Sequence, residues 1–189
     1  MIDHRAQEVL DFWFGVGAER GKRHKRWFEK DAALDAEIVA RFSAVHDHVA
    51  RSPVWLDPAQ ACLARIVALD QFPRHLFRGK AQAFATDPLA LAAARHALAR
   101  SYDRALLPVE RLFVYLPFEH SEALEDQRLA CELCRPLEAF EETADTYRYA
   151  LAHHAIIERF GRFPHRNAAL GRESTPEELA FLKQPGSSF

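Results

Sequence analysis

The sequence has little glycine, no long apolar run and too few cysteines for a disulfide framework. Seven glycines stand among 189 residues rich in Ala, Leu, Glu and Arg, a composition that favours helices and argues against an all-β fold. No run of about 18 apolar residues occurs, so we expect no membrane-spanning helix. The three cysteines (Cys62, Cys131 and Cys134) are an odd number within helical patterns. This indicates reduced thiols and a cytoplasmic location.

An excess of charge of either sign is also missing. The chain has 25 Lys and Arg against 27 Asp and Glu, a formal net charge of −2, so nucleic acid is not an expected partner. The N-terminal segment carries acidic residues and no apolar core of signal-peptide length, so we expect no secretion signal. With 49% hydrophobic residues, a chain of this length can bury its own core. We expect a single domain over residues 1–189, without a cofactor.

Hydrophobic residues recur every three or four positions along the chain, and no segment alternates as a strand does. Capping residues, glycines and prolines mark the ends of the expected helices, at about 3–14, 27–49, 58–71, 87–101, 108–117, 121–134, 146–161 and 175–182. The expected fold is all-α, an irregular array of about seven or eight antiparallel helices. No clean 34-residue repeat is present.

One carboxylate is expected inside the core. On the helix at 58–71, Asp70 projects from the same face as Ile66 and Leu69 at 100° per residue. A buried carboxylate near a helix C-terminus is unfavourable both through desolvation and through the helix dipole. Asp70 should therefore have a cationic partner, for which Arg74 and Arg78 are the nearest candidates.

A second inward polar group is His153, which lies in the apolar stripe of the helix at 146–161. A core histidine bonded to a neighbouring carboxylate or carbonyl is one interpretation. His120 and Gln127 also fall on expected inward positions, and several buried polar groups together indicate a network or a pocket.

Carboxylate and imidazole groups that could transfer protons occur in two segments. Glu119 beside His120, or either of them with His153 or His165, would make a pair in which the carboxylate orients a general base. The catalytic candidates are therefore His153, His165 and Glu119. Ser121 is explained as a helix N-cap or as a nucleophile, but no Gly-x-Ser-x-Gly motif supports a serine hydrolase.

A metal site is not expected. The His-Glu-x-x-His motif of zinc proteases and the paired Glu-x-x-His motifs of di-iron bundles are absent. Cys131-x-x-Cys134 has no second cysteine pair to complete a zinc site.

Two short segments resemble each other: 69–75 (LDQFPRH) and 160–166 (FGRFPHR). We call them the first and second Phe-Pro segments. Each is expected to be a helix end followed by Phe-Pro and basic residues, and the two could face one another across a groove. Shared helix-capping chemistry is the alternative to a true duplication. Guanidinium groups suit carboxylate or phosphate, although internal carboxylates could pair with all of them. The candidate ligand-binding residues are Asp70, Arg74, Arg78, His120, Gln127, Arg162, His165, Arg166 and Asn167.

Several long motifs extend over essentially the whole chain: LDQFPR (69–74), FRG (77–79), YLPFEHSE (115–122), RFGRFPHRN (159–167) and STPEE (174–178). With these motifs the chain resembles the bacterial domain of unknown function 924 family. The resemblance implies an all-α, tetratricopeptide-like fold and no established activity, so no catalytic residues follow from it. His75 departs from the Asn expected after Phe-Pro-Arg, which weakens any role for a side-chain amide there.

Three functions stay open. The first is binding of a small anionic ligand or an acidic peptide end in a helical groove lined by Arg74, Arg78, His120, His153, Arg162, His165 and Arg166. The second is a metal-independent hydrolase or lyase with His153 or His165 as general base, oriented by Glu119 or Asp70. The third is a structural or interaction scaffold with a buried polar network. The sequence does not determine the oligomeric state.

Overall fold

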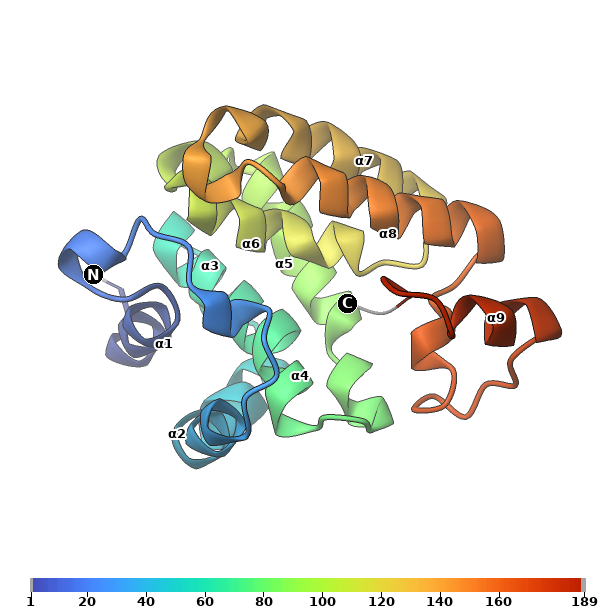
Figure 1. Cartoon of the computed structure of the whole chain (residues 1–189). Helices are drawn as coiled ribbons and strands as arrows, with labels where there is room; N and C mark the ends of the chain where they lie inside the picture. Colours follow the sequence, from blue (N-terminus) through green and yellow to red (C-terminus); the bar gives the residue numbers. More distant parts are fainter. Residues whose placement is uncertain (1, 188–189) are drawn as a thin grey trace.

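The computed structural model describes residues 2–187, and the regular structure within them is entirely helical (Figure 1). The α-helices are α1 (His4–Phe14), α2 (Ala32–Arg51), α3 (Ala59–Ile66), α4 (Phe72–Leu76), α5 (Asp87–Ala99), α6 (Pro108–Glu119), α7 (Leu124–Cys134), α8 (Thr146–Phe160) and α9 (Pro176–Phe181). A π-helical segment, η3 (Val67–Gln71), joins α3 to α4 without a break. Counted with this junction, residues 2–187 contain eight α-helical rods, which confirms the all-α prediction.

Short 3-10 helices connect these rods. They are η1 (Gly17–Glu19), η2 (Lys25–Trp27), η4 (Ala81–Phe84), η5 (Tyr102–Ala105), η6 (Arg135–Ala139), η7 (Glu141–Thr143) and η8 (Pro164–Arg166). The last of them carries the basic residues of the second Phe-Pro segment.

The start of α2 corrects one prediction. The helix begins at Ala32 rather than at Trp27, because the Asp31 carboxylate accepts the N–H groups of Ala33 and Leu34 and so caps it there. Trp27 instead lies in η2 and packs edge-on against Phe113, with ring centroids 4.8 Å apart. The aromatic pattern before α2 therefore came from core packing and not from a helix.

Two prolines that were predicted to end helices lie inside them. Helix α6 continues through Pro117 to Glu119, and the α3–α4 run continues through Pro73. Proline has no backbone N–H to donate to the carbonyl four residues before it. For Pro73 that carbonyl belongs to Leu69, and Thr86 Oγ1 donates to it at 2.7 Å. The wider π turn and this side-chain donor explain why the helix continues past Pro73.

Neighbouring helices pack in nearly sequential order. Helix α3 lies between α1 and α5, α6 packs on α5, and α7 lies between α6 and α8. Figure 1 shows α7 and α8 side by side along one edge and α9 at the end away from α1 and α2. A main hydrophobic core runs through α1 to α7 and includes Ala150 of α8, and a small separate cluster of Ile156, Ile157 and Phe163 lies near α9.

The chain offers no helix that could cross a bilayer: within residues 2–187 none is both long and apolar enough.

Candidate functional site

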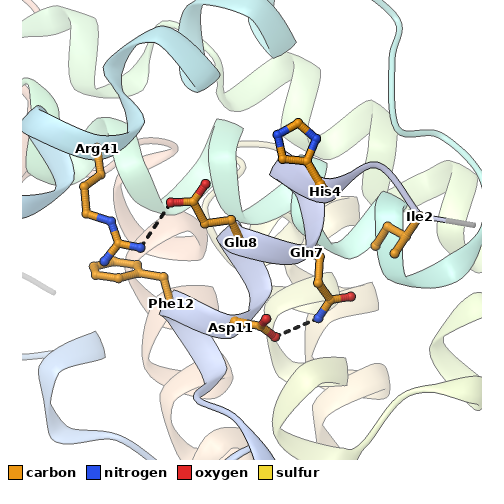
Figure 2. Close-up of a pocket in the computed structure, with 7 residues that line it drawn as sticks. All are labelled: Ile2, His4, Gln7, Glu8, Asp11, Phe12 and Arg41. Atoms are coloured by element: carbon orange, nitrogen blue, oxygen red, sulfur yellow. Dashed lines mark hydrogen bonds and ion pairs between the residues drawn. The ribbon is translucent and has the colours of Figure 1, made fainter.

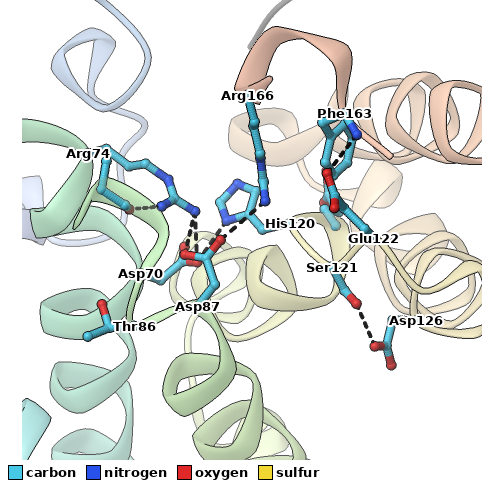
Figure 3. A network of polar contacts seen from close by, with 12 residues as sticks. Asp70, Arg74, Thr86, Asp87, His120, Ser121, Glu122, Asp126, Phe163 and Arg166 are labelled. Carbon is cyan, nitrogen blue, oxygen red and sulfur yellow. Dashed lines mark hydrogen bonds and ion pairs between the residues drawn. The ribbon is translucent and has the colours of Figure 1, made fainter. Parts of the chain in front are cut away.

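Five charged or titratable side chains from four parts of the chain meet in one cluster (Figure 3). We call them the Asp87 cluster: Asp70 in η3, Arg74 in α4, Asp87 at the start of α5, His120 just after α6, and Arg166 in η8. Both Phe-Pro segments thus contribute an arginine. The side chains of Arg74, Asp87 and His120 are each about one-fifth exposed, at 22%, 17% and 17%. One side of the cluster therefore faces solvent.

Asp70 is fully buried, as predicted, and its main partner is a histidine. His120 Nδ1 lies 2.7 Å from Asp70 Oδ1, whereas Arg74 Nη2 is 3.9 Å from the same oxygen. Gln71 Nε2 donates to the other carboxylate oxygen at 2.5 Å. Burial by itself raises the pKa of Asp70, but the charge and hydrogen bond of His120, with Arg74, bring it below the usual value. Asp70 is therefore a carboxylate that accepts from His120.

Asp87 is shared by the two arginines. Its Oδ1 lies 2.7 Å from Arg74 Nη2 and its Oδ2 lies 3.3 Å from Arg166 Nη1. Both guanidinium carbons also lie 4.8 Å from the centroid of the Phe84 ring. Burial raises the pKa of Asp87 even though both arginines oppose the shift. One carboxylate and one aromatic ring thus hold together the arginines of both Phe-Pro segments.

Arg166 is the more enclosed of the two arginines. Only 6% of the residue is exposed, and its guanidinium also lies 4.5 Å from the centroid of Phe163. Burial, followed by the charge of Arg74, lowers its pKa to about 10. Its Nε is buried and has no hydrogen-bond partner among residues 2–187, an arrangement that usually calls for an explanation.

A second polar network lies deeper, next to the cluster. Glu119 Oε1 accepts from Cys134 Sγ at 3.2 Å, and Glu119 Oε2 lies 3.4 Å from His153 Nδ1. Burial raises the pKa of Glu119 to about 8 and lowers the pKa of His153 to about 3. His153 Nδ1 also donates to the carbonyl of Tyr149 at 2.8 Å. The predicted Glu119–His153 pair therefore exists, with both groups neutral at pH 7.

His165 lies beside Phe163, with ring centroids 5.5 Å apart. Burial lowers its pKa to about 4, with a further contribution from Arg166. His165 is thus a neutral imidazole close to the cluster.

Other predicted ligand residues have structural partners elsewhere. Arg78 makes a bidentate pair with Asp35, at 2.7 and 2.6 Å, and does not join Asp70. Arg162 makes a bidentate pair with Glu178, at 2.6 and 2.8 Å. The structure does not bring these two arginines together with Arg74.

The two predicted amide side chains support backbone or neighbouring residues. Gln127 Nε2 donates to the carbonyls of Glu119 and Ser121, at 2.6 and 2.7 Å, at the C-terminal end of α6. Asn167 Nδ2 donates to Ser174 Oγ at 3.0 Å. These contacts fix the chain around the cluster rather than enter it.

Ser121 faces away from the cluster. Its Oγ donates to Asp126 at 2.7 Å and accepts the N–H of Ala123 at 3.2 Å, and Figure 3 shows it pointing away from Asp70. Helix α7 begins only at Leu124, so the hydroxyl supports the turn before the helix.

Sequence reasoning missed Asp87 and Phe84 as members of the site. Asp87 begins the helix expected at 87–101, where an Asp before a proline is typical of an N-cap. Thr86 occupies the cap position instead, and the Asp87 carboxylate pairs with the arginines. The capping pattern was the only feature of the local sequence that singled out Asp87. It does not indicate that the start of α5 lies opposite Arg74.

Two pockets lie away from the cluster. One of about 810 Å³ lies along α1 and α2, lined by Ile2, His4, Gln7, Glu8, Asp11, Phe12 and Arg41 (Figure 2). The other, of about 360 Å³, is lined by Arg159, Phe160, Arg162, Thr175, Glu177 and Glu178. Of the predicted ligand residues only Arg162 lines either pocket, and its carboxylate partner Glu178 lines the same one. Within residues 2–187 no three His, Cys, Asp or Glu side chains gather as metal ligands.

Comparisons with known proteins identify relatives but no activity. A solved structure from Agrobacterium tumefaciens, described as the protein of unknown function ATU0120, is 43% identical, with a TM-score of 0.85 over 95% of this chain and 97% of that one. No curated protein matches. The model of the family described as "bacterial protein of unknown function (DUF924)" matches residues 9–186. The chain therefore belongs to the DUF924 family of bacterial proteins of unknown function.

Proposed function

We propose that the protein binds a small anionic ligand at the Asp87 cluster, through the guanidinium groups of Arg74 and Arg166. The observation that carries this proposal is the sharing of one carboxylate, Asp87, between two arginines. Asp87 accepts from one Nη of each arginine, so further N–H groups of both guanidiniums remain to bind the oxygens of an oxyanion.

The geometry of the donors supports an oxyanion. Arginine presents its N–H groups as a planar fork that fits carboxylate or phosphate oxygens. The buried Arg166 Nε without a protein partner offers one such N–H group. A phosphate, a free carboxylate and the C-terminus of an acidic peptide all share the required chemistry.

Titration with inorganic phosphate, acetate and a short acidic peptide tests this proposal. We expect at least one of them to raise the melting temperature at low ionic strength. Isothermal titration should then show that Arg166→Lys lowers the affinity by about tenfold or more, because lysine keeps the charge but loses the fork. Comparing the three probes identifies the oxyanion.

Arg162→Lys is the matched control. Arg162 belongs to the same segment as Arg166, but its fork is already bound by Glu178, so its variant should keep the wild-type affinity. Equal affinity of the Arg166 variant and wild type, or no response to any probe, would overturn the proposal. Circular dichroism of both variants excludes unfolding as the cause of a loss.

An enzymatic role is the second candidate, and the 2.7 Å contact between Asp70 and His120 favours it. The base would be His120, rather than His153 or His165, because burial lowers the pKa values of those two to about 3 and about 4. The scaffold alternative draws on Arg78 and Arg162, whose forks carboxylates already bind. The anion-binding proposal includes a tetratricopeptide-like superhelix, since stacked helical arrays present binding surfaces of this kind. It also includes a cytoplasmic location.

A further inference from the structure

The tautomer of His120 is fixed by its partner. Asp70 is a buried carboxylate and can only accept, so His120 Nδ1 carries the hydrogen and donates it across the 2.7 Å contact. In the neutral ring the other nitrogen, Nε2, then carries the lone pair. A carboxylate in this position also holds the ring in one orientation.

His120 is the accessible partner of the Asp70–His120 pair. The side chain of Asp70 is 1% exposed and that of His120 is 17% exposed, so the exposed part of the ring lies away from the carboxylate. In Figure 3 the imidazole lies between Asp70 and the end of the Arg166 side chain. His153 is a neighbour, with ring centroids 6.2 Å apart, but its side chain is only 7% exposed.

Nearby hydroxyl and thiol groups are engaged elsewhere. Ser121 Oγ donates to Asp126. Cys134 Sγ donates to Glu119, and burial keeps its pKa well above the usual value, so it is a neutral thiol. The nucleophile best placed beside the two arginines is therefore the imidazole of His120.

We infer that His120 Nε2 accepts a phosphoryl group from a small phosphoryl donor whose oxygens are held by Arg74 and Arg166. This inference rests on the proposed oxyanion site. One guanidinium fork already satisfies the two oxygens of a carboxylate. The Ala83 carbonyl takes one N–H of Arg74, and Asp87 takes one N–H of each arginine. The remaining N–H groups of the two guanidiniums are more than a carboxylate needs, which suits the three oxygens of a phosphoryl group.

The substrate class follows from the leaving group. Glu119 and His153 lie 3.4 Å apart in a buried network, with side chains 1% and 7% exposed, and they bond to Cys134 and to the Tyr149 carbonyl. They are therefore not placed to protonate a leaving group, and burial lowers the pKa of His165 to about 4. The fitting donors are therefore phosphoramidates and acyl phosphates, whose leaving groups depart as an amine or a carboxylate without receiving a proton from the protein.

The transfer balances without another reactant. The Nε2 lone pair forms the bond to phosphorus, while the bond from phosphorus to the leaving nitrogen or oxygen breaks and its electron pair leaves with that atom. In the second step water forms the new P–O bond, and the P–N electron pair returns to Nε2. The product is dihydrogen phosphate, which keeps both protons of the water.

Phosphoramidate is the direct probe. The intact protein is incubated with it, and mass spectrometry at neutral pH followed by peptide mapping finds the modified residue. We expect one phosphoryl group on His120, removed by acid as a P–N bond requires, and formed about tenfold or more faster than on His154. Inorganic phosphate should slow the reaction of the wild-type protein, because it occupies the arginine site.

Two variants separate binding from transfer. His120→Asn keeps an N–H group toward Asp70 but removes Nε2, so it should lose the adduct even at phosphoramidate concentrations that saturate the site. His154→Asn, at a partly exposed histidine of α8, should behave as wild type. Slow labelling spread evenly over the histidines, with phosphate binding intact, would overturn the transfer and leave the binding function standing. No phosphate binding in the wild type would overturn the phosphate site and the transfer together, while a response to acetate or the peptide would still support oxyanion binding.

Discussion

The two Phe-Pro segments are alike in sequence and different in backbone. The first lies within the continuous run of α3, η3 and α4, with Phe72 fully buried against Trp13 at 5.7 Å between centroids. The second follows the end of α8, where Gly161 adopts a left-handed conformation with φ of 67°. Their arginines nevertheless reach the same carboxylate and the same Phe84 ring.

The similar sequences of the two segments therefore reflect similar roles of their side chains and not a repeated structural element. In both segments the phenylalanine is fully buried, while an arginine one or two positions beyond the proline turns toward Asp87. The proline has a different structural role in each segment. Pro73 lies in a helix whose orphan carbonyl is satisfied by Thr86, and Pro164 begins the 3-10 turn that carries Arg166.

The largest expected effect comes from removing the group that joins the two segments. Asp87→Asn keeps the shape of the side chain but leaves the buried Arg166 and the partly buried Arg74 without the negative charge between them. We expect a loss of about 3 kcal/mol in the free energy of unfolding, as for other broken buried ion pairs. Urea unfolding at pH 7 measures it.

Asp47→Asn provides the comparison for this variant. Asp47 also pairs with an arginine, Arg51 at 3.2 Å, but both side chains are largely exposed. Such pairs contribute about 0.5 kcal/mol or less. If the two variants lost equal stability, Asp87 would not hold the segments together.

The sequence was sufficient for the helical class and for the burial of Asp70, because both follow from residue spacing alone. It also indicated that the two Phe-Pro segments could meet. The sequence did not indicate which acidic side chain pairs with which arginine. Asp35 is far from Arg78 in the sequence, and Asp87 is far from Arg166, so only the packing of the helices decides which pairs form.

The effect of proline was overestimated for a physical reason. Pro73 and Pro117 were expected to stop helices because proline removes a backbone donor. The cost depends on whether another donor reaches the freed carbonyl, and Thr86, which meets that need for Leu69, comes from the turn before α5. A donor so far away in the sequence cannot be recognised from the residues around the proline.

A smaller effect distinguishes the histidines of the two segments by pH. Burial lowers the pKa of His165 from 6.5 to about 4. The folded chain then binds fewer protons than the unfolded chain within this window, so stability should fall as the pH falls from about 6.5 to about 4. His165→Gln should remove about 1 to 2 kcal/mol of this acid-induced loss, measured by urea unfolding at pH 7, 5.5 and 4.

His75→Gln is the partner variant in the first segment. Burial also lowers the pKa of His75, but its hydrogen bond with Asp35 at 2.8 Å opposes the shift. Its substitution should therefore flatten the pH dependence less than His165→Gln does. The reverse order would show that the second segment is the more open to water.

The smallest effect tests the helix that continues past Pro73. Thr86→Val keeps the shape but removes the hydroxyl that donates to the buried Leu69 carbonyl, and we expect a cost of about 1 kcal/mol. Pro73→Ala restores a backbone N–H in the same turn, so adding it to Thr86→Val should recover part of the loss.

Pro164→Ala in the same background should recover nothing, because Pro164 lies in η8 and not beside this carbonyl. A double-mutant cycle by urea unfolding measures the coupling. Equal recovery by the two alanines would contradict the idea that the first segment depends on Thr86 for its helical backbone.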